Sequence, residues 1–133
     1  MSTKKPKVAV IGLGNIGRVV ASNLVKGNRE VILASNKFED AKVLAQQLGS
    51  LAKAAEVAAA IKEAEIVVFS VWFSTIQELL AKYATELQGK IVIDPSNPIA
   101  PDGKGGFKKI IAADESAGQI ISGLLPKGAK LVK

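Results

Sequence analysis

A glycine-rich loop is the part of this sequence whose residue types and spacing most clearly predict chemistry. It follows the apolar run Val8–Ile11 and reads Gly12-Leu13-Gly14-Asn15-Ile16-Gly17. In such a G-x-G-x-x-G loop, the first glycine allows a tight turn, the second lets the backbone approach a pyrophosphate, and the third lets the following helix pack on the strand. The N–H groups at the start of that helix would face the phosphates. The loop therefore predicts a dinucleotide site, with a purely structural turn as the alternative.

The polar triplet Ser35-Asn36-Lys37 follows the second apolar run of the chain and bears on the choice of nucleotide. An NAD site usually has an acidic residue here, which accepts hydrogen bonds from the ribose 2′-hydroxyl. Serine and asparagine can instead donate hydrogen bonds to a 2′-phosphate, lysine supplies positive charge, and a carboxylate would repel the phosphate. We therefore favour NADP(H). Ser35 and Asn36 could also cap the helix that follows, which is compatible with the same role.

Two more segments, at the carboxyl ends of the fourth and fifth predicted strands, are candidates for the nicotinamide end of the site. They contribute Ser70, Val71, Trp72, Asn97 and Pro98. Trp72 could form a wall against the nicotinamide, or it could be an ordinary core aromatic under the next helix. Asn97 with Pro98 could bind the carboxamide or simply form a rigid turn. Asp94 is expected to hold its loop together through Asx-type hydrogen bonds rather than to act as a base.

The composition excludes several classes of site. The chain has no histidine and no cysteine, which excludes imidazole catalysis, histidine-ligated metals, disulfides and thiolate chemistry. No apolar run approaches the roughly 20 residues that cross a bilayer, and the basic start does not look like a secretion signal. The net charge of +6 comes partly from lysines near the two ends, without interleaved aromatics. An anionic small molecule therefore suits the chain better than a nucleic acid or a membrane, and we expect a cytoplasmic protein.

The spacing of the apolar residues predicts alternating strands and helices. Buried strands are predicted at 8–11, 31–34, 51–54, 66–71, 91–93 and 131–132. Amphipathic helices are predicted from residue 15, over 37–48, through 57–64, over 76–87 and from about 116 to 125, with turns over 94–106. In the first helix, Ile16, Val20 and Leu24 are expected to face the sheet.

Alternation of this kind predicts an α/β fold with right-handed crossovers. We expect one Rossmann-type domain over residues 8–133, preceded by a basic tail at residues 1–7. Its doubly wound parallel sheet should have the strand order 3-2-1-4-5-6, with the ligand outside the carboxyl ends of strands one and four.

Taken together, these segments resemble a known family. The glycine loop, Ser35-Asn36-Lys37, Val71-Trp72-Phe73, Asp94-Pro95-Ser96-Asn97-Pro98 and Ser116-Ala117 form a series that is similar to the deazaflavin (coenzyme F420)-dependent NADP oxidoreductases. The resemblance spans nearly the whole chain, and the loop after the fifth strand is its most specific part. Family members continue past the sixth strand into a further small domain, so this chain is expected to correspond to their NADP-binding part.

The resemblance also implies how a nucleotide would lie. NADPH would cross the switch point of the sheet and exchange hydride with a deazaflavin or another flavin-type acceptor. Residues 13–16 would contact the pyrophosphate and residues 35 and 36 the 2′-phosphate. The loops after strands four and five would surround the nicotinamide.

Three functions are therefore open from the sequence. The first is an NADP(H)-dependent oxidoreductase, or the nucleotide half of one, with a small-molecule redox acceptor. The second is a non-catalytic NADP(H)-binding module that senses redox state or regulates a partner. The third is a truncated relative of the hydroxyacid or imine reductases. Hydride transfer between bound rings needs alignment and water exclusion more than a proton donor, so the lack of histidine fits the first. A homodimer could complete the site, although no residue requires one.

Overall fold

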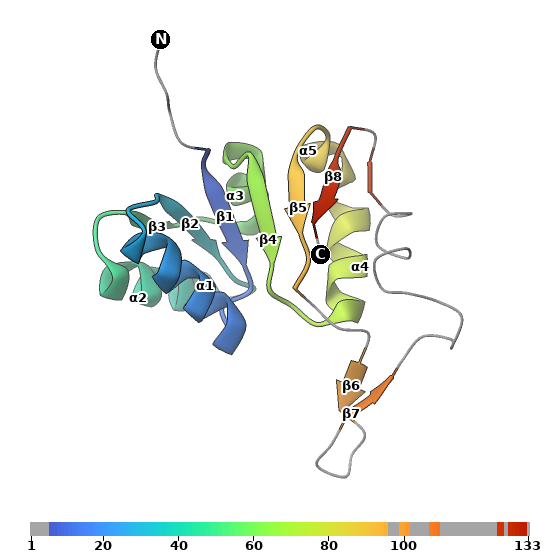
Figure 1. Cartoon of the computed structure of the whole chain (residues 1–133), viewed down its shortest axis with the longest axis horizontal. Coiled ribbons are helices and arrows are strands. Elements are labelled where there is room, and N and C mark those ends of the chain that lie inside the picture. The colour runs from blue at the N-terminus through green and yellow to red at the C-terminus, as the bar shows by residue number, and fades with distance from the viewer. Residues whose placement is uncertain (1–5, 96–98, 102–106, 110–124, 127, 133) are drawn as a thin grey trace.

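The fold is built on a parallel sheet with helices on both faces (Figure 1). The structure is a computed structural model, and it describes residues 6–95, 99–101, 107–109, 125–126 and 128–132. The six strands of the main sheet are β1 (Val8–Ile11), β2 (Val31–Ala34), β3 (Ala52–Ala54), β4 (Ile66–Phe69), β5 (Ile91–Ile93) and β8 (Lys130–Val132). They lie in the order β3-β2-β1-β4-β5-β8, and all neighbours are parallel. This confirms the predicted doubly wound α/β fold.

The strands β1 and β2 are buried on both faces, as their uninterrupted apolar sequences predict. Every residue of β1 and β2 is buried. Alternate residues enter two separate cores because successive side chains point to opposite faces. Ala9 and Ile11 pack in one core, which includes Phe69, whereas Val8 and Val10 pack in the other.

Helices cover the two faces unequally. The first core lies under α3 (Val57–Glu63), α4 (Phe73–Lys82) and α5 (Ala84–Leu87), and the second lies under α1 (Asn15–Lys26) and α2 (Phe38–Leu48). Beside α1, an apolar groove of about 410 Å³ has Ile66, Val68 and Ile93 on its floor. Right-handed crossovers carry the described helices after β3 and β4 to the opposite face. The β4–β5 half of the α1 face is therefore covered by no helix in the described part of the chain.

The first helix is rotated relative to the prediction. Ile16 was expected to face the sheet, but its side chain is 55% exposed. Gly17 and Ala21 are the buried residues of α1, and Val20 and Leu24 pack at the side of the core. The helical period correctly identified an apolar stripe, but the close packing of Gly17 centres the contact one residue later.

Other boundaries differ from the predictions in smaller ways. The fourth strand ends at Phe69 rather than at residue 71, and the third begins at Ala52 rather than at 51. The helix predicted over 76–87 is two helices, because Tyr83 has non-helical dihedral angles between α4 and α5. The stretch predicted as turns contains part of an antiparallel pair, β6 (Ile99–Pro101) with β7 (Phe107–Lys109). The helix predicted from about 116 to 125 lies, except for its last residue, outside the described residues.

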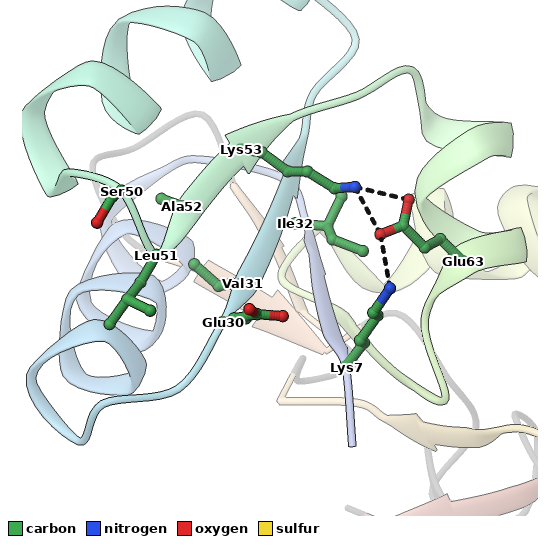
Figure 2. A pocket seen from close by; sticks show the side chains of 9 residues that line it. All are labelled: Lys7, Glu30, Val31, Ile32, Ser50, Leu51, Ala52, Lys53 and Glu63. Atoms are coloured by element: carbon green, nitrogen blue, oxygen red, sulfur yellow. Dashed lines mark hydrogen bonds and ion pairs between the residues drawn. The ribbon is translucent and has the colours of Figure 1, made fainter. Parts of the chain in front are cut away.

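A charged cluster joins three elements at the amino-terminal edge of the sheet (Figure 2). The carboxylate of Glu63, at the end of α3, accepts from the ammonium group of Lys53 on β3 at 2.6 and 2.8 Å. It also accepts from Lys7, just before β1, at 3.3 Å. The hydrogen bond from Lys53 is the largest cause of a lowered pKa for Glu63, and desolvation opposes it in part. The cluster borders a cavity of about 190 Å³.

The lowered pKa predicts an acid-dependent contribution of Glu63 to stability. A carboxyl group that titrates lower in the folded chain than in the unfolded chain stabilises the fold above its usual pKa of 4.5. That contribution is lost as the pH falls through the folded-state value. We therefore expect Glu63→Gln to lower the free energy of unfolding at pH 7, with the difference from wild type vanishing at strongly acidic pH. Urea unfolding at a series of pH values measures this difference.

Glu78→Gln is the matched control, because Glu78 is exposed on α4 and has no ion pair among the described residues. Its effect on stability should be small at every pH. High salt should reduce the effect of Glu63→Gln, since its partners are partly exposed. A stability difference that does not change with pH would contradict the role given to the charge of Glu63.

Candidate functional site

The glycine loop lies at the carboxyl edge of the sheet, between the ends of β2 and β4. The N–H of Gly12 donates to the carbonyl of Ala34 at 2.9 Å, and the N–H of Ser70 donates to the carbonyl of Ile11 at 2.8 Å. These bonds fix the loops after β1, β2 and β4 relative to one another. In open α/β sheets, ligands bind outside this edge, where the order of the strands reverses.

Two of the three glycines are required by close backbone contacts. Gly12 has a φ of +94°, and a Cβ there would lie 2.5 Å from the carbonyl oxygen of Ser70 and 2.7 Å from the side chain of Val71. A Cβ on Gly17 would overlap the carbonyl oxygen of Gly12 and would lie 3.3 Å from the Cβ of Ser70. A Cβ on Gly14, by contrast, would meet no atom within 4 Å. The middle glycine therefore borders open space at the start of α1.

The start of α1 presents backbone N–H groups to this open space. Its N-cap is Gly14, with no side-chain capping bond, and its first turn contains no acidic residue. The guanidinium of Arg18 donates from Nε to the carbonyl of Leu13 at 3.1 Å, so that this exposed cation is anchored beside the loop. Uncapped N–H groups and the positive end of the helix dipole favour a bound anion.

The triplet after β2 forms a turn that leaves two of its side chains exposed. Ser35 is 8% exposed, and its hydroxyl donates to the side-chain oxygen of Asn36 and accepts from the N–H of Lys37, each at 3.2 Å. Asn36 and Lys37 are exposed. The capping alternative is wrong, because α2 begins at Phe38 with Lys37 as its N-cap and no side-chain capping bond. The Ser35 hydroxyl instead stabilises the turn that presents its two neighbours.

The segment after β4 approaches the glycine loop from the other side. Val71 is partly buried against the first core, and its side chain is the one that a Cβ on Gly12 would meet. Trp72 is the N-cap residue of α4, and its side chain is 49% exposed. The alternative of an ordinary core aromatic is therefore wrong. The strand ends before this residue, which leaves the indole at the rim of the sheet edge.

The segment after β5 is anchored by a buried carboxylate residue. Asp94 is fully buried, and its N–H donates to the carbonyl of Val132 at 2.9 Å. Asn97 and Pro98, the candidates for the nicotinamide carboxamide, lie outside the described residues. Figure 1 shows the β6–β7 pair that follows them at the same carboxyl edge of the sheet. Sequence patterns did not indicate this pair.

Other kinds of site are not found in the described part of the chain. The described residues contain no group of three or more aspartate or glutamate residues that could hold a metal ion. No described helix is both long enough and apolar enough to cross a membrane. Among these residues, the carboxyl edge is where an uncapped helix start, a glycine loop and an exposed aromatic side chain lie together.

The glycine contacts predict that two alanine substitutions lower stability by very different amounts. Gly17→Ala should destabilise the fold by about 3 kcal/mol, because its Cβ would overlap backbone rather than a flexible side chain. Gly14→Ala should cost less than about 1 kcal/mol, since its Cβ enters open space and only the N-cap preference changes. Urea unfolding of both variants measures the difference. Equal stabilities would contradict the close packing of α1 on the loop.

Comparison with known proteins identifies a matching family and structurally similar oxidoreductases. The family model described as NADP oxidoreductase, coenzyme F420-dependent, matches residues 7–98, which include the loops after β1, β2 and β4. A proposed F420-dependent NADP reductase from Arthrobacter sp. FB24 is 26% identical, with a TM-score of 0.81 over 96% of this chain and 61% of that structure. An imine reductase from Myxococcus stipitatus, solved with NADP+, is 25% identical, with a TM-score of 0.61 over 70% of this chain and 33% of that structure.

A curated enzyme is similar to this chain over a shorter stretch. The prephenate dehydrogenase of Lactococcus lactis subsp. cremoris is 32% identical over 79 residues, which are 59% of this chain and 22% of that enzyme. The chain thus spans less than two thirds of each of these relatives. The family match over residues 7–98 covers more than half of the chain and confirms the resemblance recognised in its motifs. The chain belongs to the coenzyme F420-dependent NADP oxidoreductase family.

Proposed function

We propose that the chain binds NADP(H) at the carboxyl edge of β1, β2 and β4, as the nucleotide half of an oxidoreductase. The reaction would transfer hydride between NADPH and a deazaflavin or flavin-type acceptor. The observation that carries the proposal is the cradle at Gly14. Tight backbone contacts at Gly12 and Gly17 leave space above Gly14, directly against the uncapped start of α1.

The pyrophosphate would lie in this cradle. Its negative charge suits the N–H groups of the first turn of α1 and the anchored guanidinium of Arg18. A side chain at position 14 would occupy the space that the phosphates need, which gives a functional reason for glycine at a position with an ordinary, negative φ. The residues present therefore fit a dinucleotide.

The 2′-phosphate would lie against Asn36 and Lys37. Both are exposed at the end of β2, and the first acidic residue after the strand, Glu39, lies in the first turn of α2. The ribose 2′-hydroxyl of NAD would lack the usual carboxylate at the strand end, whereas a phosphate would gain an ammonium group. The imine reductase relative was solved with NADP+, which supports the same nucleotide.

The nicotinamide would extend toward Trp72, and when bound it supplies the hydride. The residues of the chain would then orient the nicotinamide ring and exclude water from it. The exposed indole would border the ring and exclude water from one side, and the backbone bond from Asp94 to Val132 fixes the loop after β5. The given sequence contains no histidine, so its own residues supply no imidazole for proton transfer. A flavin-type acceptor suits such a site because hydride moves between two aligned rings.

Calorimetric titration with NADPH and NADH tests the nucleotide, and nicotinamide absorbance with and without flavin acceptors tests turnover. We expect NADPH to bind more tightly than NADH. Equal affinities would overturn the assignment of the 2′-phosphate site. Tight NADPH binding with no oxidation by any flavin or deazaflavin acceptor would instead favour a redox-sensing module.

Asn36→Asp tests the residue that would face the 2′-phosphate. A carboxylate at this exposed position should weaken NADPH binding by tenfold or more, on the order of 1.4 kcal/mol, through like-charge repulsion. NADH binding should not be weakened in this way, because NADH lacks the 2′-phosphate and its 2′-hydroxyl can donate to a carboxylate. Calorimetry with both nucleotides measures the two effects separately.

The matched control is Asn23→Asp, which adds the same charge at an exposed position of α1, away from its start. It should leave the ratio of the two affinities unchanged. If Asn36→Asp also left that ratio unchanged, the end of β2 would not be the part of the chain that reads the phosphate.

A further inference from the structure

Ser70 carries a buried hydroxyl whose hydrogen-bonding capacity is not used. Its Oγ is shielded from solvent and has no hydrogen-bond partner, which is true of no other buried polar side-chain atom among the described residues. A hydroxyl has one donor and two acceptor positions, and leaving them unmatched inside a protein lowers stability. Alanine would fill almost the same space without this cost. The hydroxyl therefore needs an explanation beyond packing.

The side chain lies at the junction between the glycine loop and the segment after β4. The Cβ of Ser70 is 3.3 Å from where a Cβ on Gly17 would stand, and the carbonyl oxygen of Ser70 is 2.5 Å from where a Cβ on Gly12 would stand. Its backbone N–H is already bonded to the carbonyl of Ile11. The backbone N–H of Ser70 thus helps to fix the junction, whereas its side-chain hydroxyl has no hydrogen-bond partner.

The same junction connects the two ends of the proposed nucleotide site. On one side are the loop and the start of α1, which would hold the pyrophosphate. On the other side, the next two residues are Val71, which packs close to Gly12, and the half-exposed Trp72. A small shift of either segment moves atoms around the Ser70 hydroxyl, because backbone and Cβ atoms are in contact there without intervening side chains.

We propose that Ser70 is a positioning residue for the nucleotide, which gains its hydrogen-bond partner when a nucleotide binds at the glycine loop. This inference rests on the proposed NADP(H) function. The partner would be a backbone group of the loop or a water held by the phosphates, since the buried Oγ does not face the open space directly. The new bond would add to nucleotide affinity and would couple the loop to the position of Trp72.

The hydroxyl should therefore stabilise the nucleotide-bound chain and not the free chain. We expect Ser70→Ala to leave the thermal midpoint of the free chain unchanged or raised. The same variant should weaken the binding of NADP+ and NAD+ by similar factors, about fivefold to tenfold, the measure of one hydrogen bond. The factors should be similar because the junction lies between the pyrophosphate and the nicotinamide ends of the proposed site, and both nucleotides share these groups.

Trp72 supplies a second readout, because it is the only tryptophan in the chain. In the wild type, saturation with NADP+ should change its fluorescence. In Ser70→Ala the change at saturation should be smaller, because the loop and the Trp72 segment are less tightly coupled. Ser74→Ala, an exposed serine of α4, is the matched control and should alter neither affinity nor fluorescence.

Differential scanning fluorimetry, calorimetry and tryptophan fluorescence on the three proteins decide the matter. Weaker binding with an unchanged or raised midpoint supports the proposal. Unchanged affinity in Ser70→Ala overturns it, and so does a lowered midpoint of the free chain, which would show that the hydroxyl already has a structural role. A wild type that binds neither nucleotide overturns the proposed function together with this inference, whereas normal wild-type binding confines any failure to Ser70.

Discussion

The contact of Gly17 with the backbone of Gly12 is the constraint on which the site depends. Because neither residue has a Cβ, the first turn of α1 lies directly against the end of β1. This contact sets the rotation of the helix, so that Gly17 and Ala21 face the sheet and Ile16 faces out. It also brings the uncapped N–H groups to the edge where the order of the strands reverses. The close packing of α1 and the open space for the proposed phosphates thus follow from the same absence of side-chain atoms.

The two edges of the sheet differ in whether their positively charged groups have partners. At the amino-terminal edge, Lys7 and Lys53 share the carboxylate of Glu63. Lys90 donates to the carbonyls of Ile61 and Ala64 at the end of α3, where partial burial lowers its pKa. At the carboxyl edge, the start of α1 has no side-chain cap, and the cation that follows β2 is exposed. Positive potential is therefore matched at one edge and left for a ligand at the other.

The topology could be predicted because its signals are local and redundant. Continuous apolar runs predict strands that are buried on both faces, and the right-handed rule then leaves few arrangements of the alternating helices. The details that depend on contacts between distant segments could not be predicted. The helical period located an apolar stripe on α1 but not its centre, because Gly17 packs against Gly12 and Ser70, the residues that follow β1 and β4. The exposure of Trp72 likewise depends on where β4 ends, which the apolar run through Val71 obscured.

The candidate site divides in the same way. The sequence predicts its phosphate end, because the spacing of the glycines reflects the space that a pyrophosphate needs and the residue type after β2 reflects the charge of the 2′-phosphate. The sequence does not predict its nicotinamide end, because that end depends on loops whose positions are set by packing. Ser70 shows the difference, since no sequence pattern distinguishes a serine with a partner from one without. The described residues thus explain how the phosphate groups of a dinucleotide would be bound. In the proposed reaction, an acceptor ring would have to be held in register with the nicotinamide, with water excluded from between the two rings.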